Sequence, residues 1–281
     1  MFIIIKLSRA SICGTVCLAL AACNPGGIGG RAPVPLPLLL EGSALRPAPV
    51  SAPPFSLAAA TTGPAGSDTV LIVIEGDGHA YDTRRRASGD PTPRRPRGLD
   101  LARALAAHHR PVAYLARPCQ WSPGDLRTVC RAEDWTTARF SPRILAASAG
   151  AVEALTDRVS ARRAVLVGYS GGAQLAVMIA RRSGAVTGLG TLSGVVDHAA
   201  WTAHHGVSPL AGSSAPPPPP DIPQIHILGT ADTVAPPHLL REWLDTASDR
   251  SRIAVLAVEG MGHDGPIPQE QAATLATLAA R

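Results

Sequence analysis

The sequence has few aromatic residues and, after Lys6, no lysine. Phenylalanine, tyrosine and tryptophan make up 4% of its 281 residues, and the formal net charge is +5. Because the other cations are all arginine, this charge reflects genomic base composition as much as function. The densest arginine cluster, Arg84 to Arg97, has no interleaved aromatic residues and so lacks the pattern of a nucleic-acid-binding surface. We interpret it as a solvated loop; contact with anionic lipid or an acidic substrate is the alternative.

Metal-ligating patterns are also missing. The histidine pairs His108-His109 and His204-His205 have no cysteine or carboxylate at ligand spacing. We therefore expect no metal site, and nothing in the sequence indicates another cofactor. His226 alternates with apolar neighbours, which is typical of a histidine buried in a strand.

The N-terminal apolar stretch is too short to span a bilayer as a permanent helix. It contains Lys6 and Arg9 and ends in Leu20-Ala21-Ala22-Cys23. This segment resembles a bacterial lipoprotein signal peptide, which implies that residues 1–22 are removed and that Cys23 carries the lipid. An ordinary cleaved secretory signal is the alternative, and it would also export the protein.

The lipoprotein resemblance implies a place in the bacterial cell envelope, anchored to the membrane by lipid. The residue after the cysteine, Asn24, is not the aspartate associated with inner-membrane retention. In a Gram-negative cell the protein would therefore sit in the outer membrane, facing the periplasm or the exterior. Loss of Lys6 and Arg9 with the signal lowers the net charge from +5 to +3. Export also argues against a nucleic-acid partner.

Cysteine is scarce, and export assigns a fate to each of the five. Cys13 and Cys17 leave with the signal, and Cys23 is taken by lipid. Cys119 and Cys130 remain, and we expect them to form a disulfide in an oxidising compartment. The segment they close follows a strand-like run at residues 112–115. The disulfide would stabilise a substrate-side loop or have a purely structural role.

A serine lies at a sharp turn between a strand and a helix. The apolar run from Val165 breaks into Gly168-Tyr169-Ser170-Gly171-Gly172, and an i, i+3, i+4 pattern from Leu175 to Gly184 predicts a helix after it. Such a turn needs small flanking residues and exposes the serine hydroxyl above the sheet. Ser170 is thus a candidate nucleophile, and the alternative is an ordinary helix-capping serine.

A nucleophilic serine needs a histidine base and a carboxylate that orients it. Asp232 follows the strand-like run at residues 225–228, and His263 follows the run at residues 253–258 on a glycine-flanked loop. Both therefore lie where strands end, in the order serine, acid, histidine. Asp197, which follows the preceding strand, is the alternative acid.

These motifs resemble the α/β-hydrolase family over roughly residues 68 to 281. The resemblance implies a catalytic triad of Ser170, Asp232 and His263. It also implies that the backbone N–H groups of Gly171 and Asp77 bind the oxyanion. Asp77 lies in the loop after the strand at residues 70–74, where Glu75 occupies a position at which the family commonly has histidine. A plain Gly-Asp-Gly turn is the alternative for this loop.

The composition divides the chain into a signal peptide at residues 1–22, a tether at 23–67 and a catalytic domain at 68–281. The tether is rich in proline, alanine, glycine and serine, although part of it could add an edge strand. Beyond it, strands alternate with helices predicted at residues 99–108, 143–159, 172–182, 238–246 and 269–280. This alternation predicts an α/β fold with a mostly parallel central sheet, helices on both faces and a short lid at residues 199–223.

The α/β-hydrolase resemblance implies a serine hydrolase that cleaves a carboxylic ester through an acyl-enzyme intermediate. We expect a small-molecule or lipid-like ester as substrate. A peptidase or an acyltransferase would use the same residues and differ only in the pocket. A non-catalytic envelope lipoprotein that binds a partner is the alternative from another class.

Overall fold

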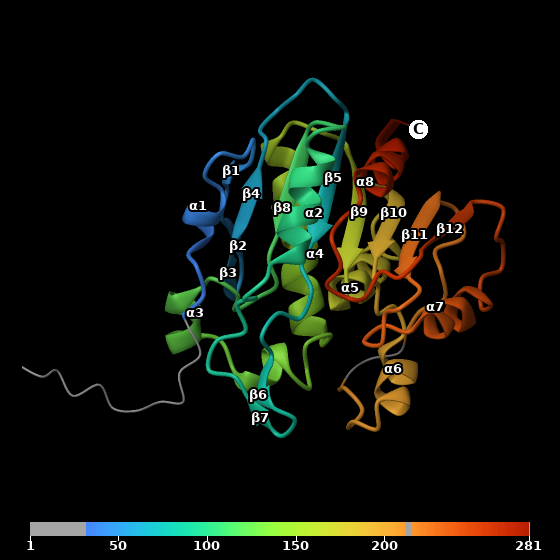
Figure 1. Ribbon diagram of the computed structural model, residues 1–281. Helices are drawn as coiled ribbons and strands as arrows, with labels where there is room; N and C mark the ends of the chain where they lie inside the picture. Colours follow the sequence, from blue (N-terminus) through green and yellow to red (C-terminus); the bar gives the residue numbers. More distant parts are fainter. Residues whose placement is uncertain (1–31, 212–214, 281) are drawn as a thin grey trace, which may run out of the picture. The chain divides into compact units, whose positions relative to one another are not determined.

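Uninterrupted apolar runs form the buried centre of the main sheet. The structure is a computed structural model, and it describes residues 32–211 and 215–280 (Figure 1). Within these residues the main sheet has the spatial order β1 (Arg46–Pro47), β4 (Ala59–Thr61), β8 (Val112–Leu115), β5 (Thr69–Ile74), β9 (Arg163–Tyr169), β10 (Val186–Leu192), β11 (Gln224–Gly229) and β12 (Ile253–Val258). Neighbouring strands from β8 to β12 pair in parallel, whereas β4 pairs antiparallel with β1 and β8.

Helices cover both faces of this sheet. The described helices are α1 (Leu36–Leu39), α2 (Arg97–Leu105), α3 (Pro123–Thr128), α4 (Pro142–Arg158), α5 (Gly171–Ala180), α6 (His198–His204), α7 (Pro237–Leu244) and α8 (Gln269–Ala276), with 3-10 turns η1 (Ala132–Trp135) and η2 (Thr277–Ala280). Ile72 and Ile74 of β5 belong to the same buried cluster as residues of α4, α5 and α7, whereas Leu71 and Val73 belong to a second cluster with residues of α2 and α8. The alternation of side chains along a strand thus builds one core on each face.

The fold predicted from the sequence is confirmed. All five helices expected between residues 99 and 280 are present, with ends that differ from the prediction by a few residues. The carboxyl ends of β5, β9, β10 and β11 point to one edge of the sheet, where α6 also lies (Figure 1). In the predicted lid region, α6 is a short helix rather than a separate cap.

The boundary of the folded part is a correction to the sequence-based prediction. Folded structure begins well before residue 68, because β1 and β4 belong to the main sheet and β2 (Val50–Ala52) and β3 (Phe55–Leu57) form a hairpin. Val50, Phe55 and Leu57 are buried in the core against α4 and its neighbours. These strands of two or three residues are too short to give a periodic signal in a proline-rich segment. Only the alternative of an edge strand anticipated them.

A second, smaller hairpin lies at the carboxyl-terminal edge of the sheet. It consists of β6 (Tyr81–Thr83) and β7 (Arg86–Ala87), and it contains part of the arginine-rich segment (Figure 1). The predicted signal peptide and the lipidated Cys23 lie outside the described residues. No helix in the part that the structure describes is long and apolar enough to cross a membrane.

Candidate active site

The turn from β9 into α5 holds Ser170 in a backbone conformation that residues with a side chain rarely adopt. Its φ is +49° and its ψ is −125°, because the chain reverses from strand to helix within one residue. Glycine is required on both sides of this turn. A Cβ on Gly168 would lie 2.3 Å from the Ala173 Cα, and one on Gly172 would lie 2.3 Å from the Ile74 carbonyl oxygen. The motif thus presses the serine-bearing turn against the end of β5.

Ser170, His263 and Asp232 form an unbroken chain of hydrogen bonds. The His263 Nε2 atom lies 2.9 Å from the Ser170 Oγ atom, and the His263 Nδ1 atom lies 2.9 Å from Asp232 Oδ2. The other carboxylate oxygen, Oδ1, accepts from the backbone N–H groups of Val234 at 2.9 Å and Ala235 at 2.8 Å. The Asp232 side chain is fully buried. Both of its oxygens are occupied, so the carboxylate has one fixed orientation toward the imidazole.

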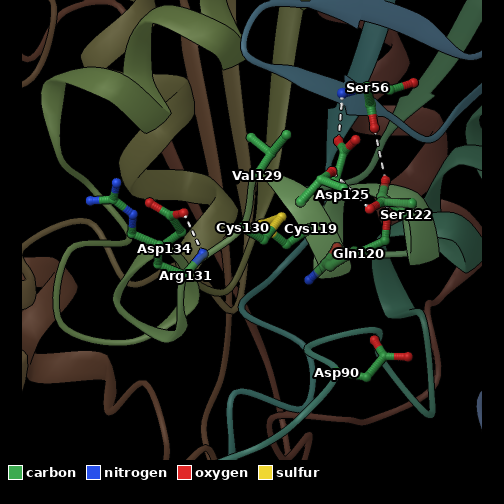
Figure 2. The surroundings of a disulfide bond; sticks show 12 residues. Ser56, Asp90, Cys119, Gln120, Ser122, Asp125, Val129, Cys130, Arg131 and Asp134 are labelled. Carbon is green, nitrogen blue, oxygen red and sulfur yellow. Dashed lines mark hydrogen bonds between the residues drawn. A yellow bond between two sulfur atoms is a disulfide. The ribbon is translucent and has the colours of Figure 1, made fainter.

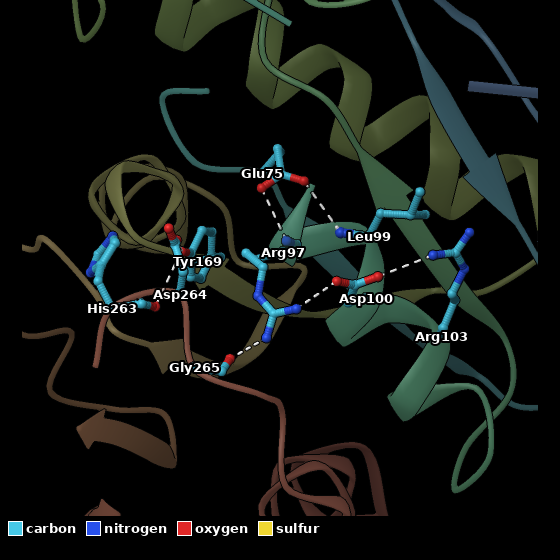
Figure 3. A network of polar contacts seen from close by, with 10 residues as sticks. Glu75, Arg97, Leu99, Asp100, Arg103, Tyr169, His263, Asp264 and Gly265 are labelled. Carbon is cyan, nitrogen blue, oxygen red and sulfur yellow. Dashed lines mark hydrogen bonds and ion pairs between the residues drawn. The ribbon is translucent and has the colours of Figure 1, made fainter. Parts of the chain in front are cut away.

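The loop that carries His263 is fastened to the serine turn and to α2 (Figure 3). The Tyr169 hydroxyl donates to Asp264 Oδ1 at 2.7 Å, and its oxygen also lies 3.3 Å from the His263 carbonyl oxygen. Burial raises the pKa of Tyr169 far above its ordinary value, so the hydroxyl remains a donor. The Arg97 guanidinium donates to the Gly265 carbonyl oxygen on the other side of the same loop.

The competing residues have other partners. Asp197 caps α6, where its Oδ1 atom accepts from the N–H groups of Ala199 and Ala200 at 3.0 Å. It is Asp232, and not Asp197, that contacts His263. His226 is fully buried in β11 with its Nδ1 atom 2.9 Å from Thr191 Oγ1, and burial lowers its pKa to about 4. The prediction that His226 is a core histidine is therefore confirmed.

The two amides expected to bind an oxyanion lie beside the serine. A Cβ on Gly171 would lie 2.2 Å from Asp77 Oδ1, and a Cβ on Gly76 would lie 3.2 Å from the Ser170 Cβ. The loop after β5 therefore packs directly against the serine turn. The Gly76 N–H donates to the Glu75 side chain at 2.9 Å, but no described residue accepts from the N–H groups of Asp77 or Gly171. Those two donors remain free for a ligand.

Glu75 fixes the start of this loop. Its buried carboxylate accepts from the Gly98 N–H at 3.0 Å and the Leu99 N–H at 3.3 Å, at the N-terminus of α2, and from the Tyr114 hydroxyl at 3.0 Å. Burial raises the pKa of Glu75, although these donors partly oppose the shift. Glu75 occupies the position at which α/β-hydrolases, which the sequence resembles, commonly have histidine. Its carboxylate links the end of β5 to the N-terminus of α2.

The Asp77 side chain pairs with two buried arginines. Its Oδ1 atom lies 2.8 Å from Arg117 Nη1, and its Oδ2 atom lies 3.0 Å from Arg139 Nε. Burial alone would raise the pKa of the Asp77 carboxyl, but the charges of Arg139 and Arg117 outweigh it and lower the pKa below its ordinary value. Neither arginine was a candidate site residue from the sequence, because both lie far from Asp77 along the chain.

The predicted disulfide is present, and its first cysteine lies two residues after Arg117 (Figure 2). Cys119 and Cys130 are joined, with their Cα atoms 6.0 Å apart. The segment they close is also tied to β3, since the Ser122 hydroxyl donates to the Ser56 carbonyl oxygen at 2.8 Å and Asp125 accepts from the Ser56 N–H at 2.6 Å. The disulfide therefore anchors the loop after β8 at the edge of the sheet that carries the serine.

A pocket of about 450 Å³ opens above Ser170. Its wall combines apolar side chains with cations; the lining includes Phe140, Val195, Trp201, Val234, His79, Arg94, Arg95 and Arg139. Trp201 belongs to α6, so the short helix of the predicted lid region forms one side of the pocket. His79 also contacts Asp82, with 3.0 Å between Nε2 and Oδ1. In the described part of the chain, no group of three or more histidine, cysteine or acidic residues could hold a metal ion.

Comparisons with known structures agree on the fold. The chain is similar to an esterase from Pyrococcus furiosus at 13% identity, with a TM-score of 0.60 and coverage of 92% of this chain and 98% of that one. It is also similar to a dienelactone hydrolase from Anabaena variabilis at 18% identity and a TM-score of 0.53, covering 84% and 94%. An α/β serine hydrolase without a lid from Xanthomonas campestris is 15% identical, with the same TM-score and coverage.

These likenesses show that the chain has the α/β-hydrolase fold. No protein-family model matches the sequence. No curated protein matches it either.

Proposed function

We propose that the protein is a serine hydrolase that cleaves a carboxylic ester through an acyl-enzyme intermediate. The observation that carries this proposal is the hydrogen-bonded chain from Ser170 through His263 to the buried Asp232. A serine that merely capped α5 would need neither the histidine nor the carboxylate behind it. Nor would such a serine need the unfavourable backbone φ of +49° that Ser170 has.

In this mechanism the Ser170 Oγ atom attacks the ester carbonyl carbon, and His263 Nε2 takes the hydroxyl proton. Asp232 holds the imidazole in the required tautomer and stabilises the imidazolium. The carbonyl oxygen becomes an oxyanion, which the N–H groups of Gly171 and Asp77 stabilise. Collapse of the tetrahedral intermediate transfers the proton to the leaving alcohol. Water then attacks the acyl-enzyme by the same route and releases the acid.

The pocket supports a small ester as substrate. Its volume of about 450 Å³ falls within the range of small-molecule sites, and its apolar wall suits an acyl chain. Two of the structural neighbours are described as an esterase and a dienelactone hydrolase, and both names denote ester cleavage. A peptidase or acyltransferase would share the triad, but no feature of this pocket favours either. The lipid anchor at Cys23, and with it a place in the bacterial envelope, remains part of this proposal.

Hydrolysis of p-nitrophenyl esters of graded acyl length tests the proposal. We expect a burst of p-nitrophenol equal to the enzyme concentration, followed by slower turnover, because p-nitrophenolate is a good leaving group and the acyl-enzyme therefore forms faster than water hydrolyses it. Ser170→Ala should abolish the burst and lower kcat by about 10⁴ or more. If no ester is turned over, the non-catalytic alternative gains; if Ser170→Ala retains the burst, another residue is the nucleophile.

A further inference from the structure

The loop after β8, which carries the disulfide, contacts the loop after β5 at two consecutive residues, Gly76 and Asp77. The Gln120 side-chain Nε2 atom donates to the Gly76 carbonyl oxygen at 3.0 Å. Three residues earlier, Arg117 Nη1 contacts Asp77 Oδ1 at 2.8 Å. Gln120 also accepts from the Arg117 backbone N–H through Oε1 at 3.0 Å, so the two holding residues are fixed to each other. Both side chains are buried.

The contact with Gly76 acts on the peptide unit that matters for the oxyanion. The carbonyl of Gly76 and the N–H of Asp77 belong to one planar trans peptide, and they point in opposite directions. A donor that fixes the carbonyl therefore fixes the direction of the N–H. It also polarises the peptide, because successive hydrogen bonds strengthen one another. The Gln120 hydrogen bond thus constrains the direction of the Asp77 N–H from a residue that does not line the pocket.

The arginines hold the same residue by its side chain. Arg117 bridges Asp77 and the Arg139 carbonyl oxygen, to which its Nη2 atom donates at 2.6 Å. Both guanidinium groups also lie over the Phe140 ring, with 5.1 Å for Arg117 and 5.6 Å for Arg139 between Cζ and the ring centroid. Each arginine side chain is only 6% exposed. Burying two cations against one carboxylate is a poor way to gain stability, so the arrangement is better explained by positioning.

The disulfide completes this arrangement. Cys119 lies immediately before Gln120 and has a φ of +75°, an unusual conformation for a residue with a side chain. Its bond to Cys130 holds that turn between Arg117 and Gln120 (Figure 2). The loop after β5 has no regular structure between β5 and β6. Its geometry beside Ser170 therefore depends on contacts with other segments, among them Gln120 and Arg117 in the loop after β8.

We propose that Gln120, within the segment closed by the disulfide, Arg117, just before that segment, and Arg139 are positioning residues that aim the Asp77 N–H at the oxyanion. This inference rests on the proposed function, in which that N–H stabilises the tetrahedral intermediate. Neither Gln120 nor Arg117 lines the pocket, in contrast to Arg139. Loss of either should therefore weaken the transition state and leave binding of the substrate unchanged.

The experiment compares wild type with Gln120→Met, Arg117→Met and the conservative Arg117→Lys. Arg143→Met is the matched control, because Arg143 also joins a carboxylate, Asp134, and the disulfide-closed segment, yet has no contact with the loop after β5.

Three quantities are measured: kcat and KM for a p-nitrophenyl ester, the Ki of an alkyl trifluoromethyl ketone, and amide hydrogen exchange of residues 75–79. With the ketone, Ser170 Oγ bonds to the carbonyl carbon, its proton passes to His263, and the carbonyl electron pair becomes an alkoxide in the oxyanion site.

We expect Gln120→Met and Arg117→Met to lower kcat by about 10- to 100-fold with KM unchanged, because a displaced oxyanion donor loses most of its effect. The Ki of the ketone should rise by a similar factor, and exchange of residues 75–79 should become faster. Arg117→Lys should recover part of each loss, and Arg143→Met should show none of them. Unchanged kcat and Ki in folded Gln120→Met and Arg117→Met would overturn the proposal, as would equal losses in Arg143→Met.

Amide exchange separates this proposal from the proposed function. If the wild-type protein neither turns over esters nor binds the ketone, the proposed hydrolase activity fails. Faster exchange at residues 75–79 in Gln120→Met, but not in Arg143→Met, would still support the positioning of the Gly76–Asp77 peptide. Unchanged exchange in every variant would overturn that positioning, whether or not the protein is a hydrolase.

Discussion

The two halves of the candidate site are held together by different kinds of interaction. The half that carries Ser170, Asp232 and His263 depends on tight turns and on hydrogen bonds to backbone groups and to Tyr169. We call this the triad half. The half that carries Asp77, which we call the oxyanion half, depends on two buried arginines, a buried glutamine and a disulfide. Both halves lie at the same edge of one sheet.

In the proposed mechanism, this difference reflects what each half must position. The triad needs side-chain atoms placed at the ends of strands β9, β11 and β12, and the parallel pairing of these strands already aligns their ends. The oxyanion half needs one peptide N–H aimed from an irregular loop. A peptide carries no side chain that can be packed, so its carbonyl and the neighbouring carboxylate are held instead. We therefore expect substitutions in the triad half to remove a group that reacts or transfers a proton. Substitutions in the oxyanion half should instead misalign the Asp77 N–H.

The largest effect is expected from Asp232→Asn in the triad half. The amide would favour the wrong imidazole tautomer, so kcat should fall by about 10⁴ while the protein stays folded. Asp197→Asn is the matched control, because Asp197 also sits after a strand but only caps α6, and its effect on kcat should be small. Steady-state ester hydrolysis with circular dichroism checks both. The reverse ranking of the two variants would assign the acid to Asp197.

A smaller effect, on stability, is expected in the oxyanion half from loss of the disulfide. Replacing both Cys119 and Cys130 with serine should lower the free energy of unfolding by about 3 kcal/mol, because the unfolded chain is no longer constrained by the closed loop. Urea unfolding of the variant and of the oxidised wild type measures this difference. Equal midpoints, or alkylation of Cys119 or Cys130 in unreduced wild-type protein, would contradict a stabilising disulfide.

The smallest effect concerns acid pH. His226, buried in β11, has a pKa of about 4 in the folded protein, below the ordinary histidine value, because burial disfavours its charged form. As the pH falls, the unfolded chain takes up this proton first, so stability decreases from about pH 6.5 down to about pH 4. From pH 7.5 to pH 5 this group alone should cost about 2 kcal/mol. The charges of Arg139 and Arg117 lower the pKa of the Asp77 carboxyl, so Asp77 stays ionised from pH 7.5 to pH 5 and keeps its ion pairs with both arginines.

Urea unfolding at the two pH values tests this expectation. His226→Gln should reduce the pH dependence of the unfolding free energy by about 2 kcal/mol, whatever its effect at neutral pH. His108→Gln, at an exposed position, serves as the control and should leave the pH dependence unchanged. An identical pH dependence in His226→Gln and wild type would show that His226 does not become protonated on unfolding.

The comparison between the halves also explains how much the sequence could predict. The strands, the helices and the residues Ser170, Asp232 and His263 were accessible, because each follows an apolar run and lies in a short local motif. The hairpin of β2 and β3 was missed because strands of three residues have no period to detect. The contacts of Glu75, Gln120 and Arg139 were missed for another reason. Their partners are distant in sequence, and no local pattern marks a glutamine that holds a backbone carbonyl 44 residues away.

The central claim is that Ser170 is an activated nucleophile, and its reaction with a fluorophosphonate probe tests this most directly. The serine oxygen displaces fluoride from phosphorus, so mass spectrometry of the digested protein locates the adduct. We expect a single adduct on the peptide that contains Ser170, no labelling of Ser170→Ala, and labelling of Arg143→Met at the wild-type rate. An adduct on a different residue, or labelling that survives Ser170→Ala, would contradict the account.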